Sequence, residues 1–427
     1  MEKVHIVGIG GVGMSALAQA LLDRGVTVTG SDRLLDNGDA TDTLVCLKEQ
    51  GVKLYRQDGC GVDGETSRLV ISSAIESNNP DLKMANRLKV PVVHRALELA
   101  RIVSGHKLCT VTGTCGKSTV TAMLGHLLAE TGFDPLVVNG AAVIGWSEGG
   151  TRIGSVRKGK GEWAVIEADE SDKSLMVFAP DAAIITNASA DHFGLDDTQQ
   201  LFDDFRNKIL GPVIDGRILP ALKETDSSFT EAGVRFTVPM PGQHNVVNAQ
   251  LAVRLAIQLG AEPQKLAEAL ASFRGIVRRM QLVGICKGAK VYDDYAHNPE
   301  KLAAAWRTLT KGAENGIVAV WRPHGYGPLK KMMDDLAAMF PRVCRPQDKL
   351  LLLPVYDAGG TADRRVNSDQ LAERLQKSGM QVQLVKSIAE ADEVMNQEAG
   401  PGKVLVTFGA RDPNLPRLAK ALCEHYR

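Results

Sequence analysis

Short apolar runs alternate with longer amphipathic stretches along nearly the whole chain. The short runs are rich in aliphatic residues, and many are followed at once by Gly, Asp, Asn or Ser, which predicts buried strands that end in turns. Such runs lie at 4–7, 26–30, 69–73, 90–93, 108–111, 163–167, 182–186, 290–293, 317–321, 349–355, 382–385 and 404–408.

The longer stretches carry apolar residues at a spacing near 3.6, which predicts helices. They cover 14–24, 117–128, 198–209, 246–259, 299–310, 329–340, 368–377 and 415–424. The Gly- and Lys-rich segment 149–161 predicts a surface hairpin or loop, and 215–242 predicts short strands joined by turns. Strands that alternate with helices predict an α/β fold with parallel sheets, and a length of 427 residues predicts about three domains.

A tight turn containing Gly8, Gly10, Gly11 and Gly13 follows the first strand and precedes a helix. Asp32 comes at the end of the second strand, about 20 residues further on. This order of strand, glycine turn, helix, strand and acid is typical of dinucleotide-binding units, in which the acid contacts a ribose. The pattern predicts phosphate binding at the turn. An NAD site and a purely structural turn both remain open as alternatives.

A second glycine turn, TGTCGKS, joins the strand at 108–111 to the helix at 117–128. Gly113 and Gly116 let backbone N–H groups approach an anion, and the N-terminus of the helix attracts the same charge. Lys117 is expected beside the β- and γ-phosphates of a nucleotide, with the Ser118 hydroxyl on Mg²⁺. Val111 lies near the place where the usual spacing has a further glycine, so an ordinary turn with a chance Lys-Ser pair is the alternative.

Acidic and imidazole groups follow two later strands. Glu167 ends the strand WAVIE and begins the run EADESD, and His192 follows the strand AAIIT after a short loop. Ligands bind at the carboxyl ends of strands in α/β sheets, so Glu167 is a candidate to complete a Mg²⁺ site with Ser118. His192 is a candidate for a second metal or for the transferred phosphoryl group. The alternatives are a solvated acidic turn and a structural histidine.

Polar residues also gather at the starts of two helices and at one predicted boundary. His244, Asn245 and Asn248 begin a helix, where capping is favoured over contact with an adenine edge. Arg279 lies in a basic pair at the boundary near residue 278, where it can reach a phosphate from a neighbouring domain, and a solvated pair is the alternative. The run DDYAHNP, which includes Asp294 and His297, offers contacts to ribose or phosphate, with helix capping as the alternative. His324 and Tyr326 follow a further strand, where contact with a small molecule is expected.

The composition excludes several classes of protein. Lys plus Arg equals Asp plus Glu at 50 each, which gives no support for wholesale binding to nucleic acid or to an anionic membrane. Seven cysteines without a Cys-x-x-Cys spacing predict neither a disulfide framework nor a zinc site. The N-terminus enters a strand without a signal-peptide pattern, and no apolar run is long enough to span a membrane. A cytoplasmic protein is expected, with neither nucleic-acid nor membrane partners.

The motifs GIGGVGMSALA, SSAI, VTGTCGKST, EADESD, GQHNVVNA, FRGIVRRMQ, DDYAHNP, PHGY and VYDAGG occur in this order across nearly the whole chain. In this order they resemble the Mur ligases. The resemblance implies a Rossmann-like domain for a UDP-sugar (1–105), a central ATP-binding domain (106–276) and a C-terminal Rossmann-like domain (277–427). It further implies ATP-dependent amide formation between the lactyl carboxylate of UDP-N-acetylmuramate and the amine of L-alanine, through an acyl phosphate.

The resemblance also implies roles for individual residues. Lys117, Glu167 and His192 would be catalytic, with Ser118 and Glu167 on one Mg²⁺ and His192 with Glu167 on a second. ATP would contact Gly113, Thr114, Gly116, Lys117, Ser118, Thr119, His244, Asn245, Asn248, Arg279, Asp294 and His297. The substrates would contact Gly10, Gly11, Val12, Gly13, Asp32, Ser72, Ser73, His94, Arg95, His324 and Tyr326.

Several positions depart from the pattern of these ligases. Cys115 and Ser118 replace His (or Asn) and Thr, Ser189 replaces a common Glu, and Gly325 replaces the Arg of a PHRY motif. Because this position lies next to the expected amine site, the change at Gly325 bears on the choice of L-alanine as acceptor more than on the ATP chemistry. The alternatives are therefore a tripeptide or other amine acceptor, a non-catalytic UDP-sugar-binding paralogue, and an NAD-dependent oxidoreductase. A monomer or a homodimer is expected.

Overall fold

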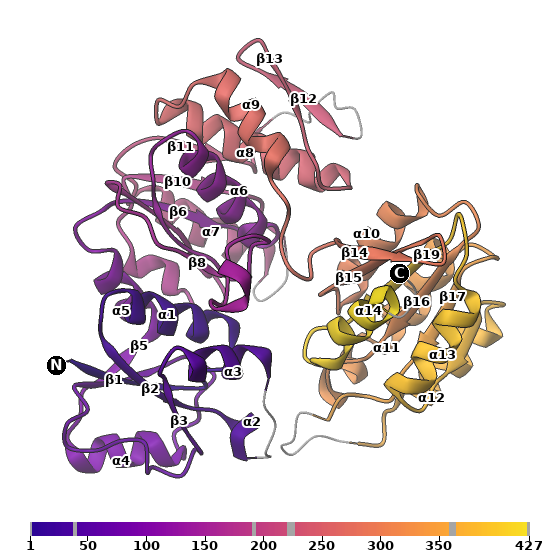
Figure 1. Cartoon of the computed structure of the whole chain (residues 1–427), viewed down its shortest axis with the longest axis horizontal. Helices are drawn as coiled ribbons and strands as arrows, with labels where there is room; N and C mark the ends of the chain where they lie inside the picture. Colours follow the sequence, from indigo (N-terminus) through magenta and orange to yellow (C-terminus); the bar gives the residue numbers. More distant parts are fainter. Residues whose placement is uncertain (1, 37–40, 190–193, 220–226, 358–363, 425–427) are drawn as a thin grey trace. The chain divides into compact units, whose positions relative to one another are not determined.

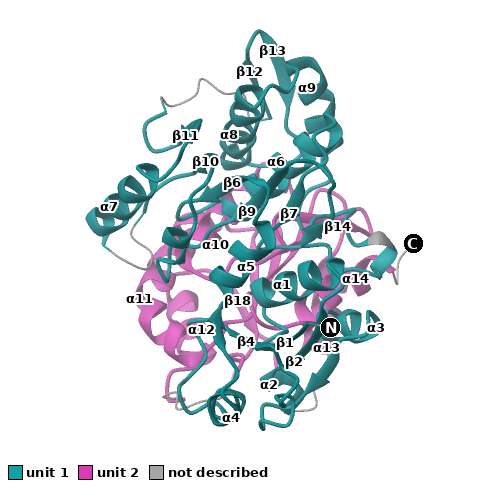
Figure 2. Ribbon diagram, turned by 90° about the vertical axis from the view of Figure 1, so that its left-hand side faces the viewer, with its two compact units in different colours: residues 1–276 teal, residues 277–427 magenta. Residues whose placement is uncertain are grey.

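The computed structural model describes residues 2–36, 41–189, 194–219, 227–357 and 364–424 (Figure 1). By contacts, the chain forms two compact units, Met1–Ile276 and Val277–Arg427, drawn in teal and magenta in Figure 2. Each unit is built from parallel sheets covered by helices, as the alternating pattern predicts. In the described part of the chain, no helix combines the length and the apolar character needed to cross a membrane.

The first sheet of the first unit has the strand order β3-β2-β1-β4-β5, and all of its pairs are parallel. The strand order reverses beside β1, so the glycine turn after β1 lies where open α/β sheets bind ligands. Its strands are β1 (Lys3–Val7), β2 (Thr27–Ser31), β3 (Lys53–Tyr55), β4 (Arg68–Ile71) and β5 (Val92–His94). Its helices are α1 (Val12–Asp23), α2 (Arg33–Asp36), α3 (Asp42–Glu49), α4 (Pro80–Leu88) and α5 (Arg95–Val103).

The second sheet has the order β11-β10-β6-β9-β7-β8, in which β8 alone runs antiparallel to its neighbour. Its strands are β6 (Lys107–Thr112), β7 (Leu136–Val138), β8 (Val156–Arg157), β9 (Trp163–Glu167), β10 (Ala182–Ile185) and β11 (Val213–Asp215). Its helices are α6 (Lys117–Glu130), α7 (Leu195–Arg206), α8 (Gln243–Gln258) and α9 (Pro263–Ser272), with 3₁₀ turns η1 (Glu148–Gly150) and η2 (Ser174–Val177). The hairpin of β12 (Ser228–Glu231) and β13 (Val234–Thr237) stands apart from this sheet.

The two sheets of the first unit share one hydrophobic core. Alternate residues of β9 point to opposite faces, so Val165 packs with α6 and α8, while Ala164 and Ile166 pack in the cluster that contains Leu17 of α1. A bidentate ion pair between Asp23 of α1 and Arg152 adds a polar contact across the same junction. The first 276 residues are therefore compact as a whole, although they contain two sheets.

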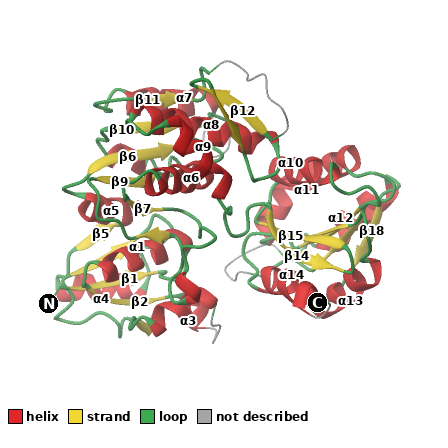
Figure 3. Ribbon diagram, turned by 45° about the horizontal axis from the view of Figure 1, so that its top comes forward, coloured by secondary structure: helices red, strands yellow, loops and turns green. Residues whose placement is uncertain are grey.

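The second unit is a sheet of order β14-β15-β19-β16-β17-β18, parallel except at β14. Val404 and Val406 of β19 pack against α10, α11 and α12, and Leu405 packs against α13 and α14 on the other face (Figure 3). The strands are β14 (Gln281–Cys286), β15 (Ala289–Asp294), β16 (Ile317–Trp321), β17 (Lys349–Leu352), β18 (Gln381–Leu384) and β19 (Val404–Phe408). The helices are α10 (Pro299–Thr310), α11 (Tyr326–Val343), α12 (Ser368–Lys377), α13 (Ile388–Glu398) and α14 (Asn414–Glu424).

The segment 149–161, predicted to be a surface hairpin or loop, is a loop only in part. Its second half contains β8, which pairs with β7 and buries Val156 at the edge of the second sheet. Helices α8 and α11 also begin three residues before their predicted starts, at Gln243 and Tyr326. Both helices begin after a glycine that lacks a side-chain cap, so no capping residue marks their starts in the sequence.

Candidate active site

The phosphate loop between β6 and α6 adopts a conformation that requires glycine at two positions. Gly113 has φ +127° and Gly116 has φ +86°, both outside the range that other residues readily adopt. A Cβ on Gly113 would lie 2.1 Å from Thr186 Oγ1, and one on Gly116 would lie 2.6 Å from Asn248 Oδ1. Helix α6 begins after Gly116 without a side-chain cap, so its first N–H groups remain available to an anion.

The segment after β10 holds this loop from the side. The Asn187 side chain accepts a hydrogen bond from the Cys115 N–H (2.9 Å) and donates one to the Cys115 carbonyl (2.9 Å). Thr186 Oγ1 donates to the same carbonyl at 2.6 Å, and the Ser189 N–H donates to Thr114 Oγ1 at 3.0 Å. The local sequence does not indicate the role of Thr186 and Asn187, because their hydrogen-bond partners lie 71 and 72 positions earlier in the chain.

We expect Asn187→Ala to raise the KM for ATP by about 10- to 30-fold, because it removes two hydrogen bonds worth roughly 1 kcal/mol each from the phosphate loop. Initial-rate kinetics and the shift of the melting temperature by ADP measure the effect. Asn207→Ala, which changes the residue after α7, provides a control for the loss of an asparagine. An unchanged KM for ATP would show that the loop keeps its shape without Asn187.

Lys117 lies folded across the phosphate loop. Its ammonium group donates to the carbonyls of Gly113 (2.8 Å) and Thr114 (3.4 Å) and to Glu170 Oε2 (2.7 Å). Burial disfavours the ammonium charge, but Glu170 and Glu167 outweigh it and raise the pKa of Lys117 above its ordinary value. Lys117 therefore carries a full positive charge at the loop, as the sequence predicts for a phosphate-binding lysine.

Glu167 and Ser118 lie at the ends of elements that meet at this loop. Glu167 ends β9 and pairs in register with Val111 of β6, and its Oε2 accepts a hydrogen bond from the Gly140 N–H at 2.8 Å. Ser118 is buried in the first turn of α6. A hydroxyl and a carboxylate oxygen are ligands that Mg²⁺ prefers. The described residues contain no cluster of three or more His, Cys, Asp or Glu side chains that could hold a metal, and His192 and Asp191 lie outside the described residues.

The carboxylates of the acidic run after β9 face two different parts of the first unit. Glu170 faces Lys117, whereas Asp169 and Asp172 face the side chains that surround the start of α5. Arg95 Nη2 lies 3.0 Å from Asp169 Oδ2, and His94 Nε2 lies 3.5 Å from Asp172 Oδ2. The interpretation of this run as a solvated acidic turn is wrong, because its carboxylates form specific ion pairs.

The glycine turn of the first sheet is held by Asp32. One carboxylate oxygen of Asp32 accepts the Gly10 N–H (2.8 Å), and the other accepts the Leu34 N–H (3.0 Å). A Cβ on Gly10 would lie 2.9 Å from Asp32 Oδ2. Helix α1 begins after Gly11 without a side-chain cap, so Val12 and Gly13 present the open N-terminus of a helix. In this structure the Asp32 carboxylate supports the turn by accepting the backbone N–H of Gly10.

The start of α8 does not use the predicted capping residues. Gly242 is the N-cap, and no side chain caps it. Asn245 Nδ2 donates to the Pro241 carbonyl at 2.7 Å, and Asn248 donates to Asn245 Oδ1 at 3.4 Å. The prediction that these amides cap the helix is therefore wrong. His244 is exposed at the start of the same helix, and Asn248 lies beside Gly116 of the phosphate loop.

In the second unit, the segment that precedes β14 has unusual backbone geometry. Arg278 and Met280 have φ of +61° and +47°. The Asp294 carboxylate accepts the N–H groups of Met280 (2.6 Å) and Ala296 (2.7 Å), and Arg278 Nε lies 3.0 Å from Asp293 Oδ2. Burial raises the pKa of Asp294. The contacts of Asp294 are thus with backbone groups on both sides of β15.

Aromatic and cationic groups gather at the carboxyl ends of β15 and β16. The Arg279 guanidinium lies 5.3 Å from the centre of the Tyr295 ring. The rings of His297 and His324 meet edge to face at 4.9 Å, and burial, followed by the neighbouring His297, lowers the pKa of His324 to about 4. Gly325 has φ +155°, a conformation that residues with a side chain rarely adopt. The sequence-predicted residues of this unit thus lie at one edge of its sheet.

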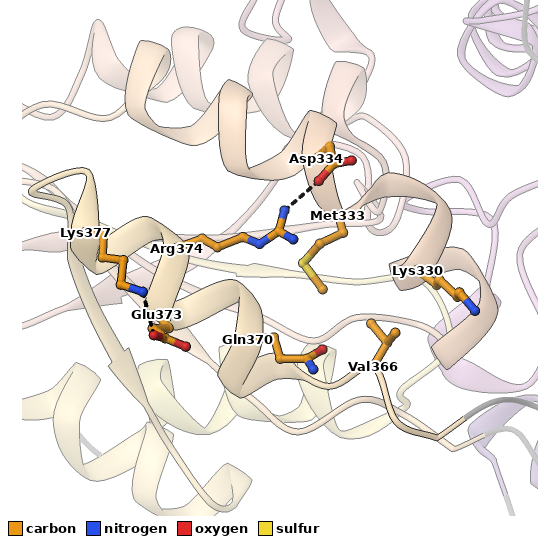
Figure 4. A pocket seen from close by; sticks show the side chains of 8 residues that line it. All are labelled: Lys330, Met333, Asp334, Val366, Gln370, Glu373, Arg374 and Lys377. Carbon is orange, nitrogen blue, oxygen red and sulfur yellow. Dashed lines mark hydrogen bonds and ion pairs between the residues drawn. The ribbon is translucent and has the colours of Figure 1, made fainter.

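A surface pocket lies between α11 and α12 (Figure 4). Asp334 pairs with Arg374 across it, and Glu373 pairs with Lys377 along α12. The described residues that line the pocket include none of the predicted site residues. Because the pocket shares no residue with the predicted site, we do not assign it to the candidate active site.

Three family models match the chain: the Mur ligase family catalytic domain at residues 3–107, the Mur ligase middle domain at 111–208 and the Mur ligase glutamate ligase domain at 278–411. Together they cover the first sheet, most strands of the second sheet and the second unit up to the start of α14, and they leave residues 209–277 unmatched. The chain belongs to the Mur ligase family.

Individual relatives span nearly the whole chain. The UDP-N-acetylmuramate–L-alanine ligase of Sinorhizobium fredii is 32% identical over 95% of this chain and 94% of that protein. The structure of UDP-N-acetylmuramate–alanine ligase from Thermotoga maritima aligns with a TM-score of 0.81 at 24% identity, over 100% of this chain and 99% of that one. A murein peptide ligase from Psychrobacter arcticus aligns with a TM-score of 0.67 at 21% identity, over 99% and 98%. At these identities the two structures show the shared fold.

Proposed function

We propose that this chain is an ATP-dependent ligase that joins the lactyl carboxylate of UDP-N-acetylmuramate to the amine of L-alanine, a step in peptidoglycan synthesis. The observation that carries the proposal is the phosphate loop, with Lys117 folded over it and Glu167 on the neighbouring strand. The names of the relatives that align with nearly the whole chain support the choice of substrates.

The proposed reaction has two steps. The lactyl carboxylate attacks the γ-phosphorus of ATP, so that a C–O–P linkage forms and ADP leaves. The amine then attacks the acyl carbon, and the tetrahedral intermediate collapses to an amide as inorganic phosphate leaves and the amine loses a proton. Lys117 and the N–H groups at the start of α6 stabilise the charge on the phosphoryl oxygens, which is the main contribution a protein makes to phosphoryl transfer.

Ser118, Glu167 and His192 are the residues that would hold Mg²⁺ in this proposal, with two ions expected. The donor chemistry fits, because Ser118 contributes a buried hydroxyl and Glu167 a carboxylate at the same end of the sheet. Bound Mg²⁺ would neutralise charge on the triphosphate. Glu167 is held by the Gly140 N–H through one oxygen, which fixes the direction of the carboxylate.

The remaining substrate contacts are assigned by domain. We propose three domains, 1–105, 106–276 and 277–427, which bind the UDP-sugar, ATP and the amine respectively. The uncapped start of α1 at Val12, together with Arg95, suits an anionic sugar nucleotide. The relatives that align with nearly the whole chain are ligases that act on UDP-N-acetylmuramate, which supports a UDP-sugar at this turn over the nicotinamide cofactor of an oxidoreductase.

A peptide acceptor is the second candidate, and Gly325 favours it. This glycine precedes α11 at the edge of the sheet that carries His324 and Tyr326, where the resemblance places an arginine. Gly325 has φ +155°, a backbone conformation that an arginine would rarely adopt. A site without that cation has less charge with which to select the carboxylate of a single amino acid.

A phosphate-release assay with ATP, Mg²⁺, UDP-N-acetylmuramate and a panel of acceptors tests the proposal. We expect release to require the sugar nucleotide and to be fastest with L-alanine, and mass spectrometry should detect the amide product. A preference for a tripeptide would favour the second candidate. No release with any acceptor would refute the ligase assignment. If the sugar nucleotide still bound, the outcome would indicate a non-catalytic paralogue, and NADH binding would indicate an oxidoreductase.

A further inference from the structure

The loop after β9 has two sets of contacts that point to different substrates. Glu170 is buried and pairs with Lys117 at 2.7 Å, on the side of the phosphate loop. Asp169, its neighbour in sequence, pairs instead with Arg95 of α5 at 3.0 Å. One short non-helical loop therefore contacts the groups proposed for ATP and those proposed for the sugar nucleotide.

Asp169 and Asp172 use their oxygens in the same way. In each carboxylate, Oδ1 accepts a hydrogen bond from the loop itself: Asp169 from the Ser171 N–H (3.2 Å) and Asp172 from the Ser174 N–H (2.9 Å). In each, Oδ2 faces the first sheet, where Asp172 Oδ2 lies 3.4 Å from Ser73 Oγ. Each carboxylate is thus fixed by its own backbone before it contacts a partner.

The partners on the first sheet are held in turn. His94 is the N-cap of α5, and its Nδ1 accepts the Ala96 N–H at 3.3 Å, which leaves the proton on Nε2, the atom 3.5 Å from Asp172. Arg95 Nη2 lies 3.0 Å from Asp169 and 3.9 Å from Asp172. Arg95 therefore has two carboxylates on one edge of its guanidinium.

The other edge of Arg95 faces the glycine turn. A Cβ placed on Gly13 would lie 3.1 Å from Arg95 Nη1, so the guanidinium lies over the first turn of α1. Because no side chain caps α1, an anion at this helix start would meet both the backbone N–H groups and Arg95 Nη1. Arg95 is thus oriented by carboxylates on one side while its other side faces the proposed anion.

We propose that Asp169 and Asp172 are positioning residues for the sugar nucleotide, which act by holding Arg95 at the glycine turn and His94 at the start of α5. The proposal rests on the proposed function for the identity of the anion, UDP-N-acetylmuramate. It assigns sugar selectivity to a loop in the proposed ATP domain and makes the sugar site dependent on that loop. Charge alone predicts the opposite effect, since removal of a carboxylate beside an anion site would favour the anion.

Isothermal titration calorimetry with UDP-N-acetylmuramate and steady-state kinetics of the full chain test the proposal. We expect Asp169→Asn to raise both Kd and KM for the sugar nucleotide by about tenfold, with the KM for ATP within about twofold. Asp169→Glu should recover part of the affinity. Glu170→Gln should show the reverse pattern, with altered ATP kinetics and unchanged sugar affinity. Asp204→Asn, in an exposed position on α7, is the matched control.

A double mutant separates positioning from general damage to the fold. If Asp169 acts through Arg95, Asp169→Asn will have no further effect on sugar affinity in an Arg95→Gln background. Additive losses, or an Asp169→Asn variant that binds the sugar as well as or better than the parent, would overturn the inference. Failure of the unmodified chain to bind UDP-N-acetylmuramate at all would instead refute the proposed function.

Discussion

Lys117→Ala is expected to lower kcat for phosphate release by at least about a thousandfold, while the Kd for UDP-N-acetylmuramate stays within about twofold. The ammonium group is the charged donor that lies directly across the phosphate loop. Lys117 pairs with Glu170, whereas Arg95 and His94 at the proposed sugar site pair with Asp169 and Asp172, so loss of this side chain removes none of the sugar-site pairs. Stopped-assay kinetics and calorimetry measure the two quantities separately.

A control is needed because Lys117 also pairs with the buried Glu170. Removal of one partner from a buried ion pair typically costs about 3–5 kcal/mol of stability. The Lys117→Ala, Glu170→Gln double variant removes the unpaired charge and should recover thermal stability without recovering turnover. A folded Lys117→Ala variant with near-normal kcat would contradict the assignment, and a folded variant that lost sugar binding would show that the Lys117–Glu170 pair also supports the sugar site.

The hydrophobic pattern predicts many elements closely. The bounds of α10, α12, β9, β16 and β19 agree with the structure, because each combines a strong apolar pattern with a clear signal at its start or end. The strand IVAVW is buried at every position, and Asn367 begins α12 with a capping box. Elements of this kind can be predicted from local sequence alone.

Other elements depend on contacts that the local sequence does not show. Helix α4 buries only Asp81 and Ala85, so its apolar pattern is weak. Strands β7 and β8 are three and two residues long, and they exist because each pairs with a neighbour in the second sheet. For this reason the sequence pattern predicts neither α4 nor β7, and it predicts only a surface hairpin or loop around β8.

The residues of the candidate site also fall into those that local sequence predicts and those that depend on distant contacts. Lys117 and Glu167 are predicted from strand ends and a glycine turn, which are local features. The clamp by Asn187 and the pair between Arg95 and Asp169 join positions 72 and 74 apart, so no spacing rule identifies them. Asp32 shows a further limit. An acid that binds a ribose and one that supports a glycine turn occupy the same place in the sequence.

Glu167→Gln is expected to lower kcat/KM for ATP by about 100- to 1000-fold and to raise the Mg²⁺ concentration needed for half-maximal rate. The substitution keeps the shape of the side chain, and the amide oxygen can still accept the Gly140 N–H that Glu167 accepts now. It removes one negative charge beside Lys117 and one anionic oxygen from the proposed metal site. Titration of phosphate release with Mg²⁺ and Mg²⁺-dependent binding of ADP by calorimetry measure the change.

Gly140→Ala provides an independent way to disturb the same carboxylate. A Cβ on Gly140 would lie 2.3 Å from Glu167 Oε2, so the substitution displaces the carboxylate without changing its charge. If Glu167 binds Mg²⁺, both variants will weaken Mg²⁺-dependent ADP binding, and excess Mg²⁺ will partly restore the rate. If Glu167 only supports the turn after β7, phosphate release by the Glu167→Gln variant will keep its normal dependence on Mg²⁺. Gly140→Ala will then lower the stability of the fold without changing that dependence. The two variants together therefore distinguish a metal ligand from a structural acid.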